Sequence, residues 1–294
     1  MIFGHQIVDL AYLCDKTFRQ DKEKKLTNLL PTYFIGDIHG RRDRLEALLE
    51  GIELHAASRK IEPRVYFLGD ITDRGPESCQ ALELVYQALQ KWDGSVLHLG
   101  NHDEWALDVM MKGNDSPDVD NWVLNGGMDT IKSYCGGKID PEFPAIVREK
   151  YPHHIRMLRD AVMYREIGQF ISAHAGMMPT QSLEDQNPSY FNWIRDPFLK
   201  FKEPAMRPVI HGHTILSEKP IVTENRISID TGAYHTGKLT SCYIDHASRE
   251  FSFLQASAGG VKEILPTMED RGFGTVYDRL DDLFTNTEPK PQWT

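Results

Sequence analysis

The stretch Gly69-Asp70-Ile71-Thr72-Asp73-Arg74-Gly75 follows the apolar run Val65-Tyr66-Phe67-Leu68 and precedes a helix-like segment that opens at Pro76. A run of β-forming residues that ends in Gly-Asp predicts a buried strand whose last residue carries a carboxylate beyond the sheet. Open α/β sheets bind their ligands at this edge. The stretch therefore predicts a functional turn between a strand and a helix.

The same pattern occurs twice more. Upstream, residues 33–35 lead into Gly36-Asp37-Ile38-His39-Gly40, and downstream residues 95–99 lead into Gly100-Asn101-His102-Asp103-Glu104. The three strand ends are about 30 residues apart, which is the length of a βαβ unit. Apolar residues at helical spacing occupy both intervals. Three neighbouring strand ends are therefore expected to bring Asp, His, Asp, Asn and His side chains to one place.

Composition limits the possible partners and compartments. The 294 residues carry 43 acidic and 33 basic side chains, a formal net charge of −10. Such a chain repels polyanions as a whole, so we expect no nucleic-acid partner. Four scattered cysteines argue against a disulfide framework and fit a reducing cytoplasm. No apolar run approaches the ~18 to 20 residues of a membrane span, so we expect a cytoplasmic protein with no membrane partner.

The chain divides into three parts by pattern. We predict an N-terminal extension over residues 1–30, a catalytic domain over residues 31–260, and a C-terminal tail with a short helix over residues 261–294. Glycines and prolines break residues 104–165 into short helix-like pieces, which we predict form a cap inserted over the site. Strand patterns then return and lead to His174 and His213.

Six polar residues lie at or just after the predicted strand ends: Asp37, His39, Asp70, Asn101, His174 and His213. Oxygen and imidazole ligands without thiolates suit hard or borderline divalent metals. Six ligands exceed the needs of one open catalytic metal, whereas two ions about 3.5 to 4 Å apart are usual in phosphoester chemistry. We predict that the central Asp70 bridges them. Turn residues and individually packed histidines would explain any single motif, but five motifs at this spacing favour the metal site.

Taken together, these motifs resemble the phosphoprotein phosphatase family of calcineurin-like metallophosphoesterases, particularly its bacterial serine/threonine protein phosphatases. The resemblance runs from about residue 33 to residue 243. It implies an α/β fold of two packed mixed β-sheets flanked by helices. It also implies two divalent metal ions, with manganese expected and iron or zinc as alternatives. By this resemblance Asp37 and His39 hold the first metal, Asn101, His174 and His213 hold the second, and Asp70 is shared.

The sequence departs from the family pattern at two positions. Thr72 stands where a β-branched aliphatic residue is usual, and Asp103 stands where glutamate usually follows Asn-His. Neither is an expected metal ligand. Many nucleases and other phosphodiesterases of the superfamily carry Gly-His-x-His, whereas this chain reads Gly-His-Thr-Ile from residue 212, which favours the phosphatase branch. For His211 we place a structural role ahead of a contact with the site.

A hydroxide held between the two metals is the expected nucleophile, because metal binding lowers the pKa of water from 15.7 to ≈ 7. His102, next to Asn101, is the expected general acid, and Asp73 is expected to orient it. Arg74 offers a planar charged fork for phosphate oxygens, and Arg195 resembles the family's second phosphate-binding arginine. The alternative for Asp73 and Arg74 is an ion pair that only stabilises the turn.

The leading sequence-based prediction is a metal-dependent phosphomonoesterase, and within that class a serine/threonine protein phosphatase. Its substrate would be a phosphorylated protein or a small phosphoester. The first alternative is a dinucleoside polyphosphate (diadenosine tetraphosphate) hydrolase, which the resemblance also allows. A catalytically silent binding module is a remote alternative, since the full set of expected metal ligands is present together with His102, Asp73 and Arg74.

Overall fold

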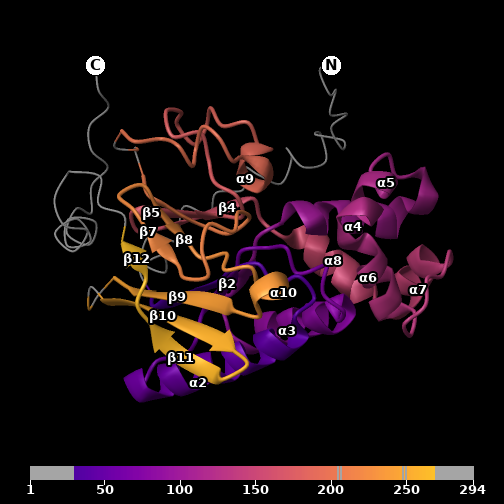
Figure 1. Ribbon diagram of the computed structural model, residues 1–294, viewed down its shortest axis with the longest axis horizontal. Helices are drawn as coiled ribbons and strands as arrows, with labels where there is room; N and C mark the ends of the chain where they lie inside the picture. The colour runs from indigo at the N-terminus through magenta and orange to yellow at the C-terminus, as the bar shows by residue number, and fades with distance from the viewer. Residues whose placement is uncertain (1–29, 204, 206, 247, 249, 269–294) are drawn as a thin grey trace.

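Two mixed β-sheets of six strands each pack face to face, with helices outside them (Figure 1). The computed structural model describes residues 30–203, 205, 207–246, 248 and 250–268. In spatial order the first sheet consists of β11 (Gly260–Ile264), β10 (Glu250–Ser257), β9 (Leu239–Asp245), β1 (Thr32–Ile35), β2 (Val65–Phe67) and β3 (Val96–Leu97). The second consists of β12 (Thr267–Met268), β7 (Ile221–Val222), β8 (Arg226–Ser228), β6 (Val209–His211), β5 (Phe170–Ala173) and β4 (Tyr164–Ile167). The predicted fold class is confirmed.

The two expected βαβ units form the centre of the first sheet. Strands β1, β2 and β3 are parallel neighbours. Helix α2 (Arg42–Arg59) connects the first two, and α3 (Ser78–Lys91) connects the second and third. Because parallel strands end at the same sheet edge, the three turns that follow them meet there.

Alternation along the strands builds the core on both sides of the first sheet. Phe34 of β1 and Tyr66 of β2 are buried between the two sheets, where they join Ile210 of β6. Tyr33 and Ile35 point to the other face and pack in the cluster formed with α2 and α3. This two-residue period is that of a strand buried on both faces, and each large apolar side chain so buried contributes about 1.5–3 kcal/mol.

Residues 101–160 form a helical lobe beside the sheets, on the right of Figure 1. Trp122, Tyr134 and Phe143 are buried in the same cluster as α3. The lobe therefore packs on the crossover helix of the catalytic core. Its helices are α4 (Asn101–Lys112), η3 (Gly113–Asp115), α5 (Val119–Trp122), η4 (Val123–Gly127), α6 (Met128–Tyr134), α7 (Phe143–Lys150) and α8 (Pro152–Asp160).

Two short helices complete the described fold. Helix α9 (Tyr190–Trp193) packs on the second sheet, and α10 (Ala233–Thr236) follows β8. We predicted that the catalytic domain ends at residue 260, but β11 and β12 pair with the sheets as far as Met268. Nearly all of the N-terminal extension and the predicted tail helix lie outside the described residues. Within the described ranges, no helix is both long and apolar enough to span a bilayer.

Candidate active site

The turns at the sheet edge contain residues with positive φ angles. Six described residues other than glycine have positive φ, and all except Lys60 are expected site residues: His39, Asp70, Asp73, Arg74 and His213. Such conformations cost about 1–3 kcal/mol each and persist where the surrounding structure enforces them. A Cβ on Gly100 would lie only 2.2 Å from the backbone nitrogen of Asp70, so a glycine is required for the two turns to approach.

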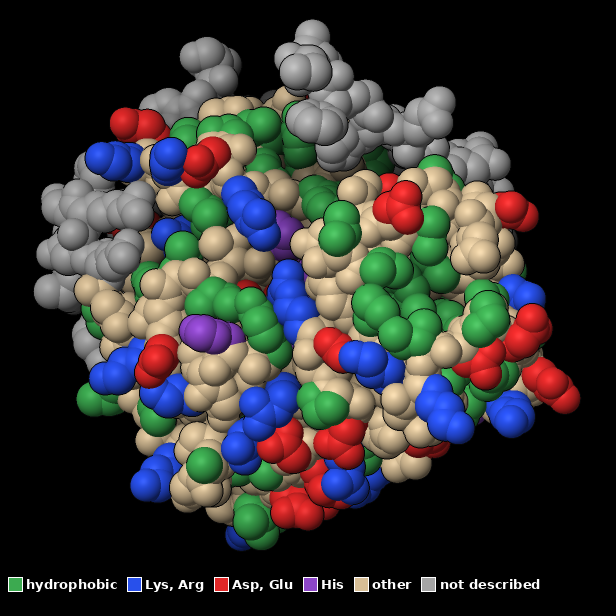
Figure 2. All heavy atoms as spheres, turned by 45° about the vertical axis from the view of Figure 1, so that its right-hand side comes forward, with side chains coloured by type: hydrophobic (Ala, Val, Ile, Leu, Met, Phe, Trp, Pro, Cys, Tyr) green, Lys and Arg blue, Asp and Glu red, His purple; other side chains and the backbone are tan. Residues whose placement is uncertain are grey.

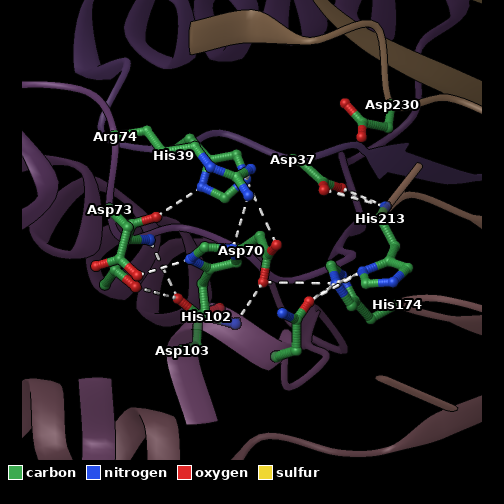
Figure 3. A network of polar contacts seen from close by, with 12 residues as sticks. Asp37, His39, Asp70, Asp73, Arg74, His102, Asp103, His174, His213 and Asp230 are labelled. Atoms are coloured by element: carbon green, nitrogen blue, oxygen red, sulfur yellow. Dashed lines mark hydrogen bonds and ion pairs between the residues drawn. The ribbon is translucent and has the colours of Figure 1, made fainter. Parts of the chain in front are cut away.

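Asp70 lies at the centre of the site (Figure 3). Its Oδ2 is 3.5 Å from Nε2 of His39, and its Oδ1 is 3.5 Å from Nε2 of His174. Burial acts to raise the pKa of Asp70, but the surrounding histidines, His174 foremost, outweigh it and hold that pKa below its ordinary value. The carboxylate is thus ionised with one oxygen facing each histidine, the position that a bridging ligand needs.

The protons on His39 and His174 are assigned by their backbone partners. Nδ1 of His39 is 2.7 Å from the carbonyl oxygen of Thr72, and Nδ1 of His174 is 2.8 Å from that of Leu68. A carbonyl only accepts, so each Nδ1 donates and each Nε2 presents a lone pair. Burial lowers the pKa of both imidazoles. Neutral imidazoles held in this way are the usual form of metal-binding histidines.

Acceptor atoms converge on the His174 side of Asp70. Nε2 of His174 is 3.0 Å from Oδ1 of Asn101 and 3.2 Å from Nδ1 of His213. Within the described part of the chain, the buried Nε2 of His213 has no hydrogen-bond partner. Burial lowers the pKa of His213 to about 2, so this imidazole is also neutral. A divalent cation fits this donor set, because it would satisfy lone pairs that face one another without protons.

Two further carboxylates lie beside this cluster. Both oxygens of Asp37 are 3.0 Å from the backbone nitrogen of His213. Burial, Asp230 and Asp70 together raise the pKa of Asp37 well above its ordinary value, and burial raises that of Asp230 to about 6. Sequence analysis did not single out Asp230, which lies two residues after the end of β8. Bound cations would compensate this concentration of negative charge.

The expected contact between His102 and Asp73 is formed. Nδ1 of His102, in the first turn of α4, is 2.7 Å from Oδ2 of the fully buried Asp73. The other oxygen of Asp73 accepts hydrogen bonds from Nε1 of Trp122 at 2.9 Å and from Oγ1 of Thr130 at 2.7 Å. Burial raises the pKa of Asp73, and the contact with His102 opposes that shift. Asp73 is therefore placed to orient His102.

The helical lobe supports this turn directly, which sequence analysis missed. Besides the two donors to Asp73, the carbonyl of Gly126 accepts from the backbone N–H of Arg74 at 3.2 Å. A Cβ on Gly126 would come within 2.7 Å of the same nitrogen. Trp122 was visible in the predicted cap, but no local pattern connects it with a residue 49 positions earlier. We predicted a cap over the site, and the observed contacts of the lobe are with the turn that carries Asp73 and Arg74.

Arg74 contacts one histidine from each of the two neighbouring turns. Its Nη1 is 2.5 Å from Nε2 of His39, and its Nη2 is 2.8 Å from Nε2 of His102. Since a guanidinium only donates, both Nε2 atoms accept. This agrees with the proton assigned to Nδ1 of His39, and it places the proton of His102 on Nδ1, which donates to Asp73. The guanidinium also lies over the ring of Tyr234 in α10, 4.8 Å from its centroid. Arg74 thus contacts His39, His102 and Tyr234 at once.

Arg195 and His211 differ in their relation to the site. Arg195 is exposed in the segment after α9, and its charge contributes to lowering the pKa of His174 and of His213. His211 is fully buried, with Nε2 2.7 Å from Oγ of Ser228 and Nδ1 2.9 Å from the carbonyl of Gly212. Both imidazole nitrogens of His211 thus have hydrogen-bond partners in or next to the second sheet.

The two departures from the family pattern are bonded to each other. Oδ1 of Asp103 accepts from Oγ1 of Thr72 at 3.0 Å and from the backbone N–H groups of Thr72 and Ile71. Burial and the charge of Asp70 raise the pKa of Asp103 to about 7. Thr72 and Asp103 therefore act as one unit that holds the turn between Asp70 and Asp73.

Aromatic side chains flank the reactive groups. The ring of Tyr234 is 5.3 Å from that of His39, and the ring of Trp105 is 5.4 Å from that of His102. Trp193 continues this surface at 4.9 Å from Trp105. In Figure 2, basic and histidine side chains follow a furrow down the middle of the face. The site thus combines metal-binding, cationic and aromatic groups.

The family model for calcineurin-like phosphoesterases matches residues 30–217. The chain belongs to this family, and is thus a metallophosphoesterase, a metal-dependent hydrolase of phosphoesters. The membership expected from the sequence is confirmed at this level. The narrower phosphoprotein phosphatase family is not confirmed.

Among known proteins, the chain is similar to the asymmetrical bis(5′-nucleosyl)-tetraphosphatase PrpE of Geobacillus sp. (strain WCH70). The two are 28% identical over 233 residues, which cover 70% of this chain and 87% of that protein. The symmetrical bis(5′-nucleosyl)-tetraphosphatase of Cellvibrio japonicus is 22% identical over 269 residues, which cover 74% of this chain and 96% of that protein.

Solved structures agree on the fold. A cold-active protein tyrosine phosphatase has a TM-score of 0.55 at 16% identity, over 81% of this chain and 79% of its own. The cold-active protein-tyrosine phosphatase of a psychrophilic Shewanella species has a TM-score of 0.52 at 14% identity, over 81% of each chain. At these sequence identities the structural similarity supports the fold and says nothing about the substrate.

Proposed function

We propose that this chain is a dinuclear-metal-dependent hydrolase of bis(5′-nucleosyl) tetraphosphates. The observation that carries the proposal is the similarity, over 70% or more of the chain, to enzymes named for that activity. This function is the alternative that the sequence left open, and we place it ahead of the serine/threonine protein phosphatase that we first expected. None of these curated relatives is named for a phosphoprotein substrate.

The donor set described above supports two metal positions that share Asp70. Asp37 and His39 would hold one ion, and the second would be held by Asn101, His174 and His213. When bound, the ions, for which we propose manganese with iron or zinc as alternatives, would supply an activated water and neutralise phosphate charge. The backbone carbonyls bonded to His39 and His174 orient both imidazoles for this task.

His102 would protonate the leaving phosphate oxygen. Its Nδ1–H donates to Asp73, and its Nε2 accepts from Arg74. When Arg74 turns to the substrate phosphate, Nε2 would be free to take up a proton, and the buried carboxylate would stabilise the imidazolium. Trp122 and Thr130 hold the other carboxylate oxygen and so keep Asp73 aimed at the imidazole. The water oxygen would bond to phosphorus and lose a proton to solvent, the bridging P–O bond would break, and the proton on Nε2 would pass to the departing oxygen. His102 would then take up a proton from solvent for the next turnover.

The surroundings of the site suit a dinucleotide. Arg74, which lies between His39 and His102, would pair with phosphate oxygens and bring one positive charge to a site rich in carboxylates. Tyr234 lies beside His39, and Trp105 with Trp193 lies beside His102. Stacking of a base on an aromatic side chain contributes about 1–3 kcal/mol. A phosphoserine side chain has no ring to use these surfaces.

Substrate profiling tests the proposal. Purified protein, loaded separately with Mn²⁺, Fe²⁺ or Zn²⁺, would be given diadenosine tetraphosphate, a phosphoserine peptide and p-nitrophenyl phosphate. We expect kcat/KM for the dinucleotide to exceed that for the peptide by at least about tenfold, a difference of ~1.4 kcal/mol. Product analysis would separate cleavage at the central from cleavage at the outer phosphoanhydride. A preference for the phosphopeptide would overturn the proposal.

The shared role of Asp70 has its own test. Asp70→Asn should deplete both ions in elemental analysis, because the amide loses the charge and one of the two anionic oxygens that face the histidines. Asp108→Asn is a matched control, since Asp108 lies on α4 and pairs with Lys112. Full metal occupancy in Asp70→Asn would refute the bridging assignment.

A further inference from the structure

A second group of imidazole and carboxylate side chains lies where α8 meets α3. Oε2 of Glu83 is 2.8 Å from Nε2 of His153 and 3.2 Å from Nε2 of His154. One ligand atom from each residue lies within 4.8 Å of the others. Glu83 comes from α3, and both histidines come from the first turn of α8. The group shares no residue with the active site.

The three ligand atoms form a set that borderline divalent metals prefer. Two imidazole nitrogens and one carboxylate oxygen, with a fourth position open to water, are a known coordination set for zinc. The separations of 2.8 and 3.2 Å are those of hydrogen bonds, and small movements of the side chains would widen them to the roughly 3.3–3.6 Å between tetrahedral ligands at 2.0–2.2 Å from one ion. Glu83 and His153 are partly exposed, with side chains 39% and 23% accessible, so an ion can enter from solvent.

The neighbours of these ligands suit metal binding as well. Nδ1 of His154 is 2.7 Å from the hydroxyl of Tyr134, which is buried. Because a carboxylate only accepts, Nε2 of His154 donates to Glu83 and Nδ1 accepts from the hydroxyl of Tyr134. An ion bound at Nε2 would replace that proton, and the ring would then donate from Nδ1 to the oxygen of Tyr134. The other carboxylate oxygen of Glu83 accepts from Gln87 at 3.0 Å. Outer partners of this kind set the orientation of metal-binding imidazoles and carboxylates.

We propose that Glu83, His153 and His154 bind a divalent cation of the zinc type that fastens α8 to α3. The ion would act on the lobe as a whole. Helix α3 begins at Ser78, whose Oγ accepts from the backbone N–H of Asp73 at 3.1 Å, and α6 of the lobe supplies Thr130 to the same residue. A clamp between α8 and α3 thus stabilises the lobe that supports the catalytic turn.

Zinc counting on the full chain tests this site independently of the active-site metals. Asp70→Asn serves as the background, because it weakens the active-site positions. Metal-free protein would be titrated with Zn²⁺ in that background and with Glu83→Gln or His153→Asn added. We expect each added substitution to remove one bound equivalent. Glu46→Gln is the matched control, since Glu46 is a helical carboxylate paired with Arg42, and it should keep that equivalent.

Thermal unfolding provides a second readout. Excess Zn²⁺ should raise the Tm of the Asp70→Asn protein by a few degrees, and Glu83→Gln should abolish that shift, since a ligand that binds the folded state stabilises it by mass action. The proposal is overturned if Glu83→Gln and His153→Asn, both folded by circular dichroism, retain the zinc equivalent and the Tm shift. Neither measurement depends on which substrate the active site hydrolyses.

Discussion

The indole N–H of Trp122 donates a 2.9 Å hydrogen bond to Oδ1 of Asp73, across 49 residues of sequence. Asp73 is fully buried, and its other oxygen faces His102. The helical lobe therefore determines the orientation of the carboxylate that is expected to position the general acid. Four predictions follow from this and related contacts.

Trp122→Phe removes this donor and keeps an aromatic ring in the core. A hydrogen bond to a charged group is worth about 1.5–3 kcal/mol, so we expect kcat to fall roughly tenfold or more with little change in KM. Steady-state kinetics with diadenosine tetraphosphate would measure the split. Trp92→Phe, at another buried tryptophan, is the control for loss of indole packing. Equal effects in the two variants would reduce Trp122 to a packing residue.

His102→Ala should lose most of its turnover of p-nitrophenyl phosphate in the presence of manganese, because it removes the proposed proton donor. General acid catalysis contributes typically 10²–10⁴-fold. Elemental analysis should show both ions retained, since His102 is outside the proposed ligand set. Normal turnover in this variant would exclude the general-acid role, and loss of metal would assign His102 to the metal centre instead.

Tyr234→Ala should raise KM for diadenosine tetraphosphate by about tenfold and leave p-nitrophenyl phosphate kinetics nearly unchanged, because we propose that the ring stacks on a base. The ring is partly exposed beside Arg74 and His39. Tyr234→Phe keeps the ring and should behave like the unsubstituted protein. A similar rise in KM for both substrates would indicate that the ring positions Arg74 and does not stack on the nucleoside base.

Acid should destabilise the fold through His98. This imidazole is fully buried against Phe67 and Ser172, and burial lowers its pKa from 6.5 to about 3. Below pH 6.5 the unfolded chain takes up a proton that the folded chain does not, so stability falls as the pH drops toward 3. Between pH 7 and pH 5 the loss from this group is about 2 kcal/mol.

Denaturant unfolding of metal-free protein at pH 7, 6 and 5 measures this loss. His98→Gln keeps a donor for Ser172 without an ionisable ring and should flatten the pH dependence by that amount. An unchanged slope in His98→Gln would show that other groups carry the acid sensitivity.

Local sequence patterns were sufficient for the catalytic strands and turns. A run such as Val65-Tyr66-Phe67-Leu68 before Gly-Asp has a strand periodicity, and the helical repeat after it predicts the crossover. Right-handed connection of parallel neighbours then leaves one place for the three turns. The approach of Asp70 to His39 and to Asn101 could be predicted for that reason.

No local sequence pattern predicted the contacts that distant segments make with the site. Asp230 reaches the site from the segment after β8, and Trp122 and Thr130 reach it from the helical lobe. Their neighbours in sequence do not indicate these contacts. The bond between Thr72 and Asp103 is similar: sequence analysis marked each as a departure, but only the packing of α4 against the turn shows that they compensate each other.

The sequence by itself thus determined the fold class and identified the residues that we propose bind metal, because strand periodicity and ligand chemistry are local properties. Tertiary structure alone decided which side chains orient them. It placed the two oxygens of Asp70 toward different histidines, Trp122 and Thr130 on Asp73, and Glu83 against His153 and His154. Those relations depend on how whole elements pack, and the free energy of packing is shared among residues far apart in the chain.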